Sequence, residues 1–275
     1  MCDRAQNAPA PGLYVIATPI GNLGDLSPRA AFTIANVDVL ACEDTRTTRR
    51  LLQAGDPGPR LVSLTEHNTE ARIPQLLEAA KTGAVGIVSE AGTPAIADPG
   101  SRVVAAAHDA GLPVFSLPGP SAVMAAVAAS GFDGSDVHFL GFLPRKAGAA
   151  GTRLRAAAAT AATLVALESP NRLSDTLMVV AESLHDPVVV VSREISKVHE
   201  EHVRGSATEL AERYLTARGE CVIVIQSPPA APSDADAIGE YMAEMRRAGA
   251  KRSQAAVEAA RRFRCTRDEA YSLWE

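Results

Sequence analysis

Short polar segments rich in glycine, proline and acidic residues follow several apolar runs of this 275-residue chain. Ligands of open α/β sheets bind beyond the carboxyl ends of the strands, so the residues after each run are the first candidates for chemistry. A single such segment is only a turn, but a set that recurs through one half of the chain predicts a binding site. The segments are Thr18-Pro19-Ile20-Gly21-Asn22, Glu43-Asp44-Thr45-Arg46, Glu66-His67-Asn68, Glu90-Ala91-Gly92-Thr93-Pro94, Asp98-Pro99-Gly100 and Pro118-Gly119-Pro120-Ser121-Ala122.

The common nucleotide-binding motifs are missing from these segments. No G-x-G-x-x-G follows the first apolar run and no G-x-x-x-x-G-K-[ST] occurs, which disfavours a dinucleotide oxidoreductase and a P-loop NTPase. The segments suit a ligand that is held by backbone amides, with carboxylates near its hydroxyls or near a positive centre. S-adenosylmethionine fits this description, because its sulfonium tolerates acids and its adenine needs an apolar slot.

The elements that position these segments are strands alternating with helices. Apolar, β-branched runs between stretches of helical period are typical of β-α-β units around a mainly parallel sheet. Helix starts are predicted at Ser27-Pro28, Thr45 (with Gly55 closing that helix), Ser169-Pro170 and the capping boxes that begin at Ser206 and Thr266. The predicted strands cover residues 13–20, 37–43, 61–64, 84–90, 113–119, 137–143, 163–169, 187–194 and 220–226.

This alternation predicts an α/β protein with two α/β domains and a C-terminal helical tail. The domain boundaries are expected at 12–119 and 120–230, with a linker rich in Pro, Ser and Asp before a tail at 233–275. In the tail, a helix over 253–263, a short break and a second helix resemble a helix-turn-helix, although any helical hairpin fits as well.

The net charge of −5 argues against a polyanionic partner, but the distribution of the charges weakens this objection. Residues 246–267 contain eight Arg and Lys side chains against one acid, and Arg145, Lys146, Arg153 and Arg155 form a second cluster. Such runs are often only a solvated helix face. The four cysteines are scattered without a C-x-x-C pair, so no metal site is expected. No apolar stretch is long enough to cross a membrane, and we expect a cytoplasmic protein.

Several segments together resemble the tetrapyrrole-methylase superfamily, and within it the bacterial small-subunit ribosomal RNA (cytidine-2'-O)-methyltransferases that modify the decoding region. The resemblance spans residues 12–226 and is carried by GLYVIATPIGNLGDLSPRA, ACEDTRTTRRLL, His67-Asn68, SEAGTPAIADPG, LPGPSA, GFLPRK, LESPNRL, REISKVHEE and GECVIVI. It implies a homodimer, a cleft between the two domains for the cofactor S-adenosylmethionine, and 16S ribosomal RNA or the small ribosomal subunit as partner.

The resemblance also implies cofactor contacts along the glycine-rich segments. One position departs from the family, because the loop that commonly reads Ser-Asp-Ala-Gly has Glu90 here, which extends the carboxylate by one methylene. The implied contacts are Pro19, Gly21, Glu90, Gly92, Thr93, Pro94, Ile96, Ala97, Ser121, Ala122 and Leu167.

A ribose hydroxyl is a weak nucleophile, so its methylation benefits from a general base or a cation near the developing alkoxide. The candidates are Asp44, Glu43, His67, Glu194 and Lys197, of which we expect Asp44 as base and Lys197 as its electrostatic helper. The alternative interpretation is equally open: Asp44 caps the helix that begins at Thr45, and Lys197 is solvated.

Other polar residues are candidates for RNA contacts. Their alternatives are ion pairs with nearby acids, surface turns and solvated arginines. Arg172 is expected in the first turn of a helix, where a cation opposes the helix dipole and therefore suits a phosphate. The predicted RNA-binding residues are Arg46, His67, Asn68, Arg172, Arg193, Arg261 and Arg262.

Two other functions compete with RNA methylation. One is a methyltransferase of the same fold that acts on a tetrapyrrole or another small molecule, which would not need the basic tail. The other is a non-catalytic homologue that binds S-adenosylmethionine without turnover, for which Glu90 is the only support.

Overall fold

The computed structural model describes residues 8–52, 58–96, 98–228, 235–263 and 265–274. The chain packs as two compact units. The first ends at Ala125 and also includes Glu194–Glu200, whereas the second comprises Ala126–Arg193 and the chain from Glu201 onward. The predicted domain boundaries stay a prediction, and Gly55, the predicted helix end, lies outside the described residues.

The first unit contains a five-stranded parallel sheet in the order β3-β2-β4-β1-β5. Along β1, Leu13 enters one hydrophobic cluster while Tyr14 and Ile16 enter another, so both faces of the sheet are buried. This double burial explains why the strands are continuous apolar runs in the sequence. The strands are β1 (Gly12–Ile16), β2 (Val39–Cys42), β3 (Arg60–Ser63), β4 (Ala84–Ile87) and β5 (Val114–Leu117).

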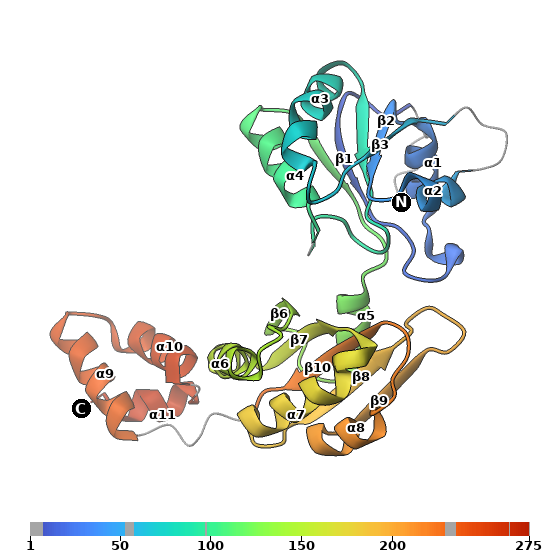
Figure 1. The fold of residues 1–275 in the computed structure, drawn as a ribbon. Coiled ribbons are helices and arrows are strands. Elements are labelled where there is room, and N and C mark those ends of the chain that lie inside the picture. Colours follow the sequence, from blue (N-terminus) through green and yellow to red (C-terminus); the bar gives the residue numbers. More distant parts are fainter. Residues whose placement is uncertain (1–7, 53–57, 97, 229–234, 264, 275) are drawn as a thin grey trace. The chain divides into compact units, whose positions relative to one another are not determined.

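Helices cover this sheet, with α3 and α4 packed together beside it (Figure 1). The predicted start of α1 is confirmed, because the Ser27 side chain accepts a hydrogen bond from the Ala30 N–H and Pro28 occupies the first helical position. The helices are η1 (Leu23–Asp25), α1 (Pro28–Asn36), α2 (Thr45–Thr48), η2 (Arg49–Leu51), α3 (Thr69–Thr82), α4 (Gly100–Asp109) and α5 (Ala122–Ser130), of which α5 spans the unit boundary.

The second unit contains a five-stranded sheet in the order β6-β7-β10-β8-β9, in which only β6 and β7 are parallel. The prediction of a mainly parallel sheet is wrong here. Glu194–Glu200 alone connects β8 to β9, and so short a connection permits an antiparallel hairpin but no crossover. The strands are β6 (Val137–Phe142), β7 (Thr163–Glu168), β8 (Val188–Arg193), β9 (Glu201–Ser206) and β10 (Cys221–Gln226).

The helices of this sheet and of the tail are α6 (Ala147–Ala158), η3 (Pro170–Arg172), α7 (Leu173–Leu184), α8 (Ala207–Arg213), α9 (Ala235–Arg247), α10 (Arg252–Phe263) and α11 (Arg267–Ser272). Both predicted capping boxes are confirmed, at Ser206 with Glu209 and at Thr266 with Glu269. The tail helices bury their own cluster around Met242. None of the described helices is long and apolar enough to span a membrane.

Candidate functional site

The loops that follow β1, β4 and β5 meet at the carboxyl ends of these adjacent strands. Thr18 and Gly92 form a two-way bridge, in which the Thr18 N–H lies 2.9 Å from the Gly92 oxygen and the Gly92 N–H lies 3.1 Å from the Thr18 oxygen. The Thr93 hydroxyl donates to the Pro120 carbonyl at 3.1 Å. Side-chain and main-chain contacts therefore fix the three glycine-rich segments to one another, at the edge where α/β sheets bind ligands.

Gly92 occupies a backbone position that suits only glycine. Its φ is +80°, and a Cβ at this position would lie 3.3 Å from Ile20 Cγ2 and 3.7 Å from the Pro120 oxygen. The residue is buried, so the tight approach of its backbone to the neighbouring loops is part of the packed structure.

The remainder of the same loop is shaped by Asp98. One carboxylate oxygen accepts from the Ala95 N–H and the other from the Gly100 N–H, each at 2.7 Å. Ile96 lies between these anchors and exposes 53% of its surface, which is unusual for a large apolar side chain. The loop thus presents an apolar surface next to fixed carboxylates. Ala97, the next predicted cofactor contact, lies outside the described residues.

Three carboxylates give this edge of the first sheet a negative field. Glu43, at the end of β2, is half-buried, and burial raises its pKa, with the charges of Glu90 and Asp98 adding to the effect. A site of this kind favours a bound cation, since a positive charge offsets the repulsion among the acids.

Asp44 is fixed at the start of α2. Its carboxylate accepts from the Arg46 N–H at 2.7 Å and forms an ion pair with the Arg46 guanidinium at 2.9 Å. These hydrogen bonds lower the pKa of Asp44 to about 2. The capping interpretation therefore describes its geometry, and a carboxylate of such low pKa is a weak base at neutral pH.

Lys197 lies over Gly21. A Cβ on Gly21 would lie 2.4 Å from Lys197 Cγ, so only glycine leaves room for this side chain. The ammonium forms an ion pair with Glu194 at 2.9 Å, and Ser196 in the same loop hydrogen-bonds Asp25 of η1. The structure thus brings Lys197 together with the loop after β1.

The remaining predicted cofactor residues lie as follows. Pro19 and Pro94 are buried, and Glu90 is exposed. Ser121 accepts from the Met124 N–H at 3.4 Å, with Ala122 beginning α5. Leu167 lies in β7 of the second unit, paired with Val222.

Among the predicted RNA-binding residues, several have local structural partners. Asn68 accepts from the Thr65 N–H at 2.8 Å, and Arg193 pairs with Glu201 of β9 at 2.7 Å rather than with its neighbour Glu194. His67 and Arg261 are exposed. The Arg262 guanidinium lies 5.1 Å from the centre of the Tyr241 ring.

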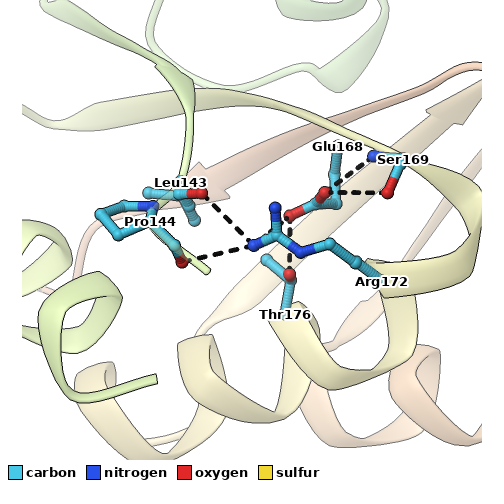
Figure 2. Close-up of polar contacts among 6 residues, drawn as sticks. All are labelled: Leu143, Pro144, Glu168, Ser169, Arg172 and Thr176. Atoms are coloured by element: carbon cyan, nitrogen blue, oxygen red, sulfur yellow. Dashed lines mark hydrogen bonds and ion pairs between the residues drawn. The ribbon is translucent and has the colours of Figure 1, made fainter. Parts of the chain in front are cut away.

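Arg172 belongs to a partly buried network that the sequence prediction missed (Figure 2). Its Nη2 atom lies 3.3 Å from the carbonyl oxygens of Leu143 and Pro144 and also 3.3 Å from the Glu168 carboxylate, whose side chain is fully buried. The available signal was the spacing of an acid and an arginine four residues apart across a helix start.

No group of acidic, histidine and cysteine side chains suited to a metal occurs among the described residues. The charged groups at the carboxyl edge of the first sheet include the carboxylates of Glu43, Asp44, Glu90 and Asp98, of which Asp44 and Asp98 already accept hydrogen bonds from the chain. Carboxylates, the exposed apolar surface of Ile96 and the close backbone at Gly92 are groups suited to binding an organic cation.

Residues 12–211 match the family described as Tetrapyrrole (Corrin/Porphyrin) Methylases. A protein from Mesorhizobium japonicum named ribosomal RNA small subunit methyltransferase I is 41% identical over 256 residues, covering 91% of this chain and 87% of that protein. A protein of the same name from Streptococcus pyogenes serotype M1 is 38% identical over 268 residues, covering 94% and 93%.

A solved structure, the uroporphyrin-III C-methyl transferase from Thermus thermophilus complexed with S-adenyl homocysteine, shares the fold with a TM-score of 0.56. It is 20% identical, and the match covers 78% of this chain and 97% of that one. The chain therefore belongs to the tetrapyrrole methylase family and, within it, to the group whose relatives are named ribosomal RNA small subunit methyltransferase I.

Proposed function

We propose that this protein is an S-adenosylmethionine-dependent methyltransferase that modifies the ribose 2'-hydroxyl of a cytidine in the decoding region of 16S ribosomal RNA. The observation that carries the proposal is 41% identity, over 91% of the chain, to a relative named as a ribosomal RNA methyltransferase. The three joined loops of the first unit supply a site of matching chemistry.

The residues of this site fit S-adenosylmethionine. Ile96 offers exposed apolar surface for the adenine, and the buried Gly92 lets backbone approach closely. The field of Glu43, Glu90 and Asp98 suits a sulfonium cation, since it stabilises the charged cofactor more than the neutral thioether left after transfer. When bound, the cofactor supplies an electrophilic methyl group.

The chain must orient the ribose hydroxyl in line with that methyl group and accept its proton as the new C–O bond forms. Of the two adjacent acids after β2, Glu43 is the better base, because its pKa is raised whereas that of Asp44 falls to about 2. Lys197 keeps its proposed role as a cation near the developing alkoxide, with Glu194 holding its ammonium.

The remaining predicted cofactor residues keep their proposed roles, as do the predicted RNA-binding residues other than Arg172, which pairs with Glu168. Binding as a homodimer and a cytoplasmic location are further parts of the proposal. They are supported by the resemblance and by the ribosomal RNA in the relatives' name.

The basic tail is proposed to contact the RNA. Arg261 and Arg262 are both exposed on α10, and the Arg262 guanidinium also lies over Tyr241, an aromatic ring of the tail's own core. Arg261→Glu should therefore weaken RNA binding about tenfold by placing an anion near phosphates, with unchanged S-adenosylmethionine affinity. Filter binding at several salt concentrations measures the first quantity and calorimetry the second; unchanged RNA affinity would remove Arg261 from the interface.

The function is tested by incubating the purified protein with isotopically labelled S-adenosylmethionine and small ribosomal subunits from cells that lack this enzyme. Nuclease digestion and mass spectrometry then locate the label. Label on a cytidine ribose is the expected result. Cofactor binding without incorporation would instead favour a tetrapyrrole or another small acceptor, and Glu90→Asp would then test whether the longer carboxylate blocks turnover.

A further inference from the structure

The turn after β6 connects a partly buried ion pair to two exposed cations. β6 ends at Phe142, after an irregularity in its pairing with β7 between Phe139 and Phe142, and α6 begins at Ala147. Between them, Leu143 is buried, while Arg145 and Lys146 are exposed. The turn thus begins at the buried Leu143 and ends at the exposed Arg145 and Lys146.

Arg172 binds the first two residues of this turn, Leu143 and Pro144. Its Nη2 atom donates to the carbonyl oxygens of Leu143 and Pro144, both at 3.3 Å. These carbonyls lie beyond the last paired residues of β6 and β7. Among the described residues, Arg172 is the side chain that donates hydrogen bonds to them. Figure 2 shows the guanidinium between the turn and the β7 end.

Glu168 in turn holds Arg172. One oxygen of this fully buried carboxylate accepts from the Ser169 N–H at 2.7 Å, and the other accepts from the Thr176 hydroxyl at 2.7 Å and pairs with Arg172 at 3.3 Å. A cation at the start of α7 opposes the helix dipole, and Glu168 offsets that cost. An ion pair of which only the carboxylate is fully buried is weak evidence for stability, but these hydrogen bonds fix the position of both side chains.

The turn and the helix α6 that follows it carry basic side chains. Residues 137–167 contain Arg145, Lys146, Arg153 and Arg155 and no Asp or Glu, in a chain whose net charge is −5. All four side chains belong to exposed residues. The surface is complementary to a polyanion, and the substrate of the proposed function is RNA.

We infer that the Glu168–Arg172 pair is a positioning device for RNA: it fixes the turn at Leu143 and Pro144 so that Arg145 and Lys146 contact phosphates of the substrate. Arg172 thereby acts through the turn rather than as the direct phosphate ligand that its sequence position suggests. This inference rests on the proposed function, because it takes RNA as the bound partner.

The test uses the full-length protein, S-adenosylmethionine and unmethylated small ribosomal subunits. Arg145→Ala/Lys146→Ala should weaken subunit binding at least tenfold and reduce the slope of log affinity against log salt by about two, one for each lost phosphate contact. Glu168→Gln/Arg172→Gln removes the pair without leaving a lone buried charge, and it should produce a comparable loss and a comparable change of slope.

The two pairs of substitutions should not add. If the ion pair acts through the turn, introducing Glu168→Gln/Arg172→Gln into Arg145→Ala/Lys146→Ala should cost less than twofold more affinity. In a matched background, Arg153→Ala/Arg155→Ala, Glu168→Gln/Arg172→Gln should keep its full effect, because these arginines belong to α6 and not to the turn that Arg172 holds. Full additivity in the first background would overturn the inference and make Arg172 a direct contact.

Pro144→Gly provides a second route if the buried substitutions fail to fold. It loosens the same turn without touching the pair, and it should give the same salt-dependent loss. Wild-type affinity and slope in both Pro144→Gly and Arg145→Ala/Lys146→Ala would refute the inference. If the wild-type protein itself transfers no methyl group to the subunits, the proposed function fails first, so the two failures are distinguishable.

Discussion

Gly92→Val should reduce S-adenosylmethionine affinity at least hundredfold, which corresponds to about 2.7 kcal/mol. Gly92 has a φ of +80°, where a β-branched residue costs about 1–3 kcal/mol of strain. The added methyl groups would also press on Ile20, because a Cβ alone would lie 3.3 Å from it. The Thr18–Gly92 bridge would be lost, and with it the fixed arrangement of the loops after β1 and β4.

Gly111→Val is the matched control for this substitution. Gly111 has a φ of +68°, so valine meets similar backbone strain, but no atom lies within 4 Å of the Cβ position. It lies between α4 and β5, at the amino end of that strand and therefore at the opposite edge of the sheet. Calorimetric titration and thermal unfolding of both variants separate binding from stability. Retained cofactor affinity in Gly92→Val would place the cofactor elsewhere. Equal losses of cofactor affinity in Gly92→Val and Gly111→Val would indicate that backbone strain, and not the position of Gly92, causes the loss.

The sequence predicted the strands best where both faces of the sheet are buried. β2 and β4 are continuous apolar runs because each strand lies between two layers of side chains. β9 was missed because this edge strand alternates exposed and half-buried residues with polar side chains. β9 pairs with β8 antiparallel through the hairpin at Glu194–Glu200. This segment can be read as a short hairpin connection only once β9 is known to be a strand.

The site was predictable where a strand end alone determines the position. The rule that ligands bind at the carboxyl ends of strands brought the Thr18, Gly92 and Pro120 segments together, and the structure connects them by hydrogen bonds. Contacts between distant segments were not predictable. Gly21 was expected beneath the cofactor. In the structure, the aliphatic part of the Lys197 side chain occupies the space that a side chain at position 21 would need, and Lys197 comes from a loop far along the chain.

The role of Arg172 shows a second limit. A cation at a helix start suggests a phosphate site only if no acid neutralises it, and the compensating Glu168 is buried at the end of β7. Asp44 poses a related problem, since an acid before a helix is equally suited to capping and to catalysis. The arginine two residues later decides the geometry, because its guanidinium closes on the carboxylate at 2.9 Å.

Replacing each of the two adjacent acids after β2 should separate the base from the helix cap. Glu43→Gln should lower kcat for methyl transfer to the small ribosomal subunit by about 10²–10⁴-fold, the usual contribution of a general base. Asp44→Asn should lower it less than tenfold, because asparagine caps a helix as well as aspartate does. The reverse pattern, an active Glu43→Gln and an inactive Asp44→Asn, would make Asp44 the base.

The pH profile of kcat/KM tests the same assignment through a neighbouring charge. Rate should rise with pH as the base loses its proton, and the negative charge of Glu90 helps to raise the pKa of Glu43. Glu90→Gln removes this repulsion, so the pKa of Glu43 should fall and the acidic limb should move to lower pH. Glu90→Asp keeps the charge and should leave the limb nearer its wild-type position. Because the pKa of Asp44 is set by Arg46 rather than by Glu90, an acidic limb that does not move in Glu90→Gln would argue against Glu43.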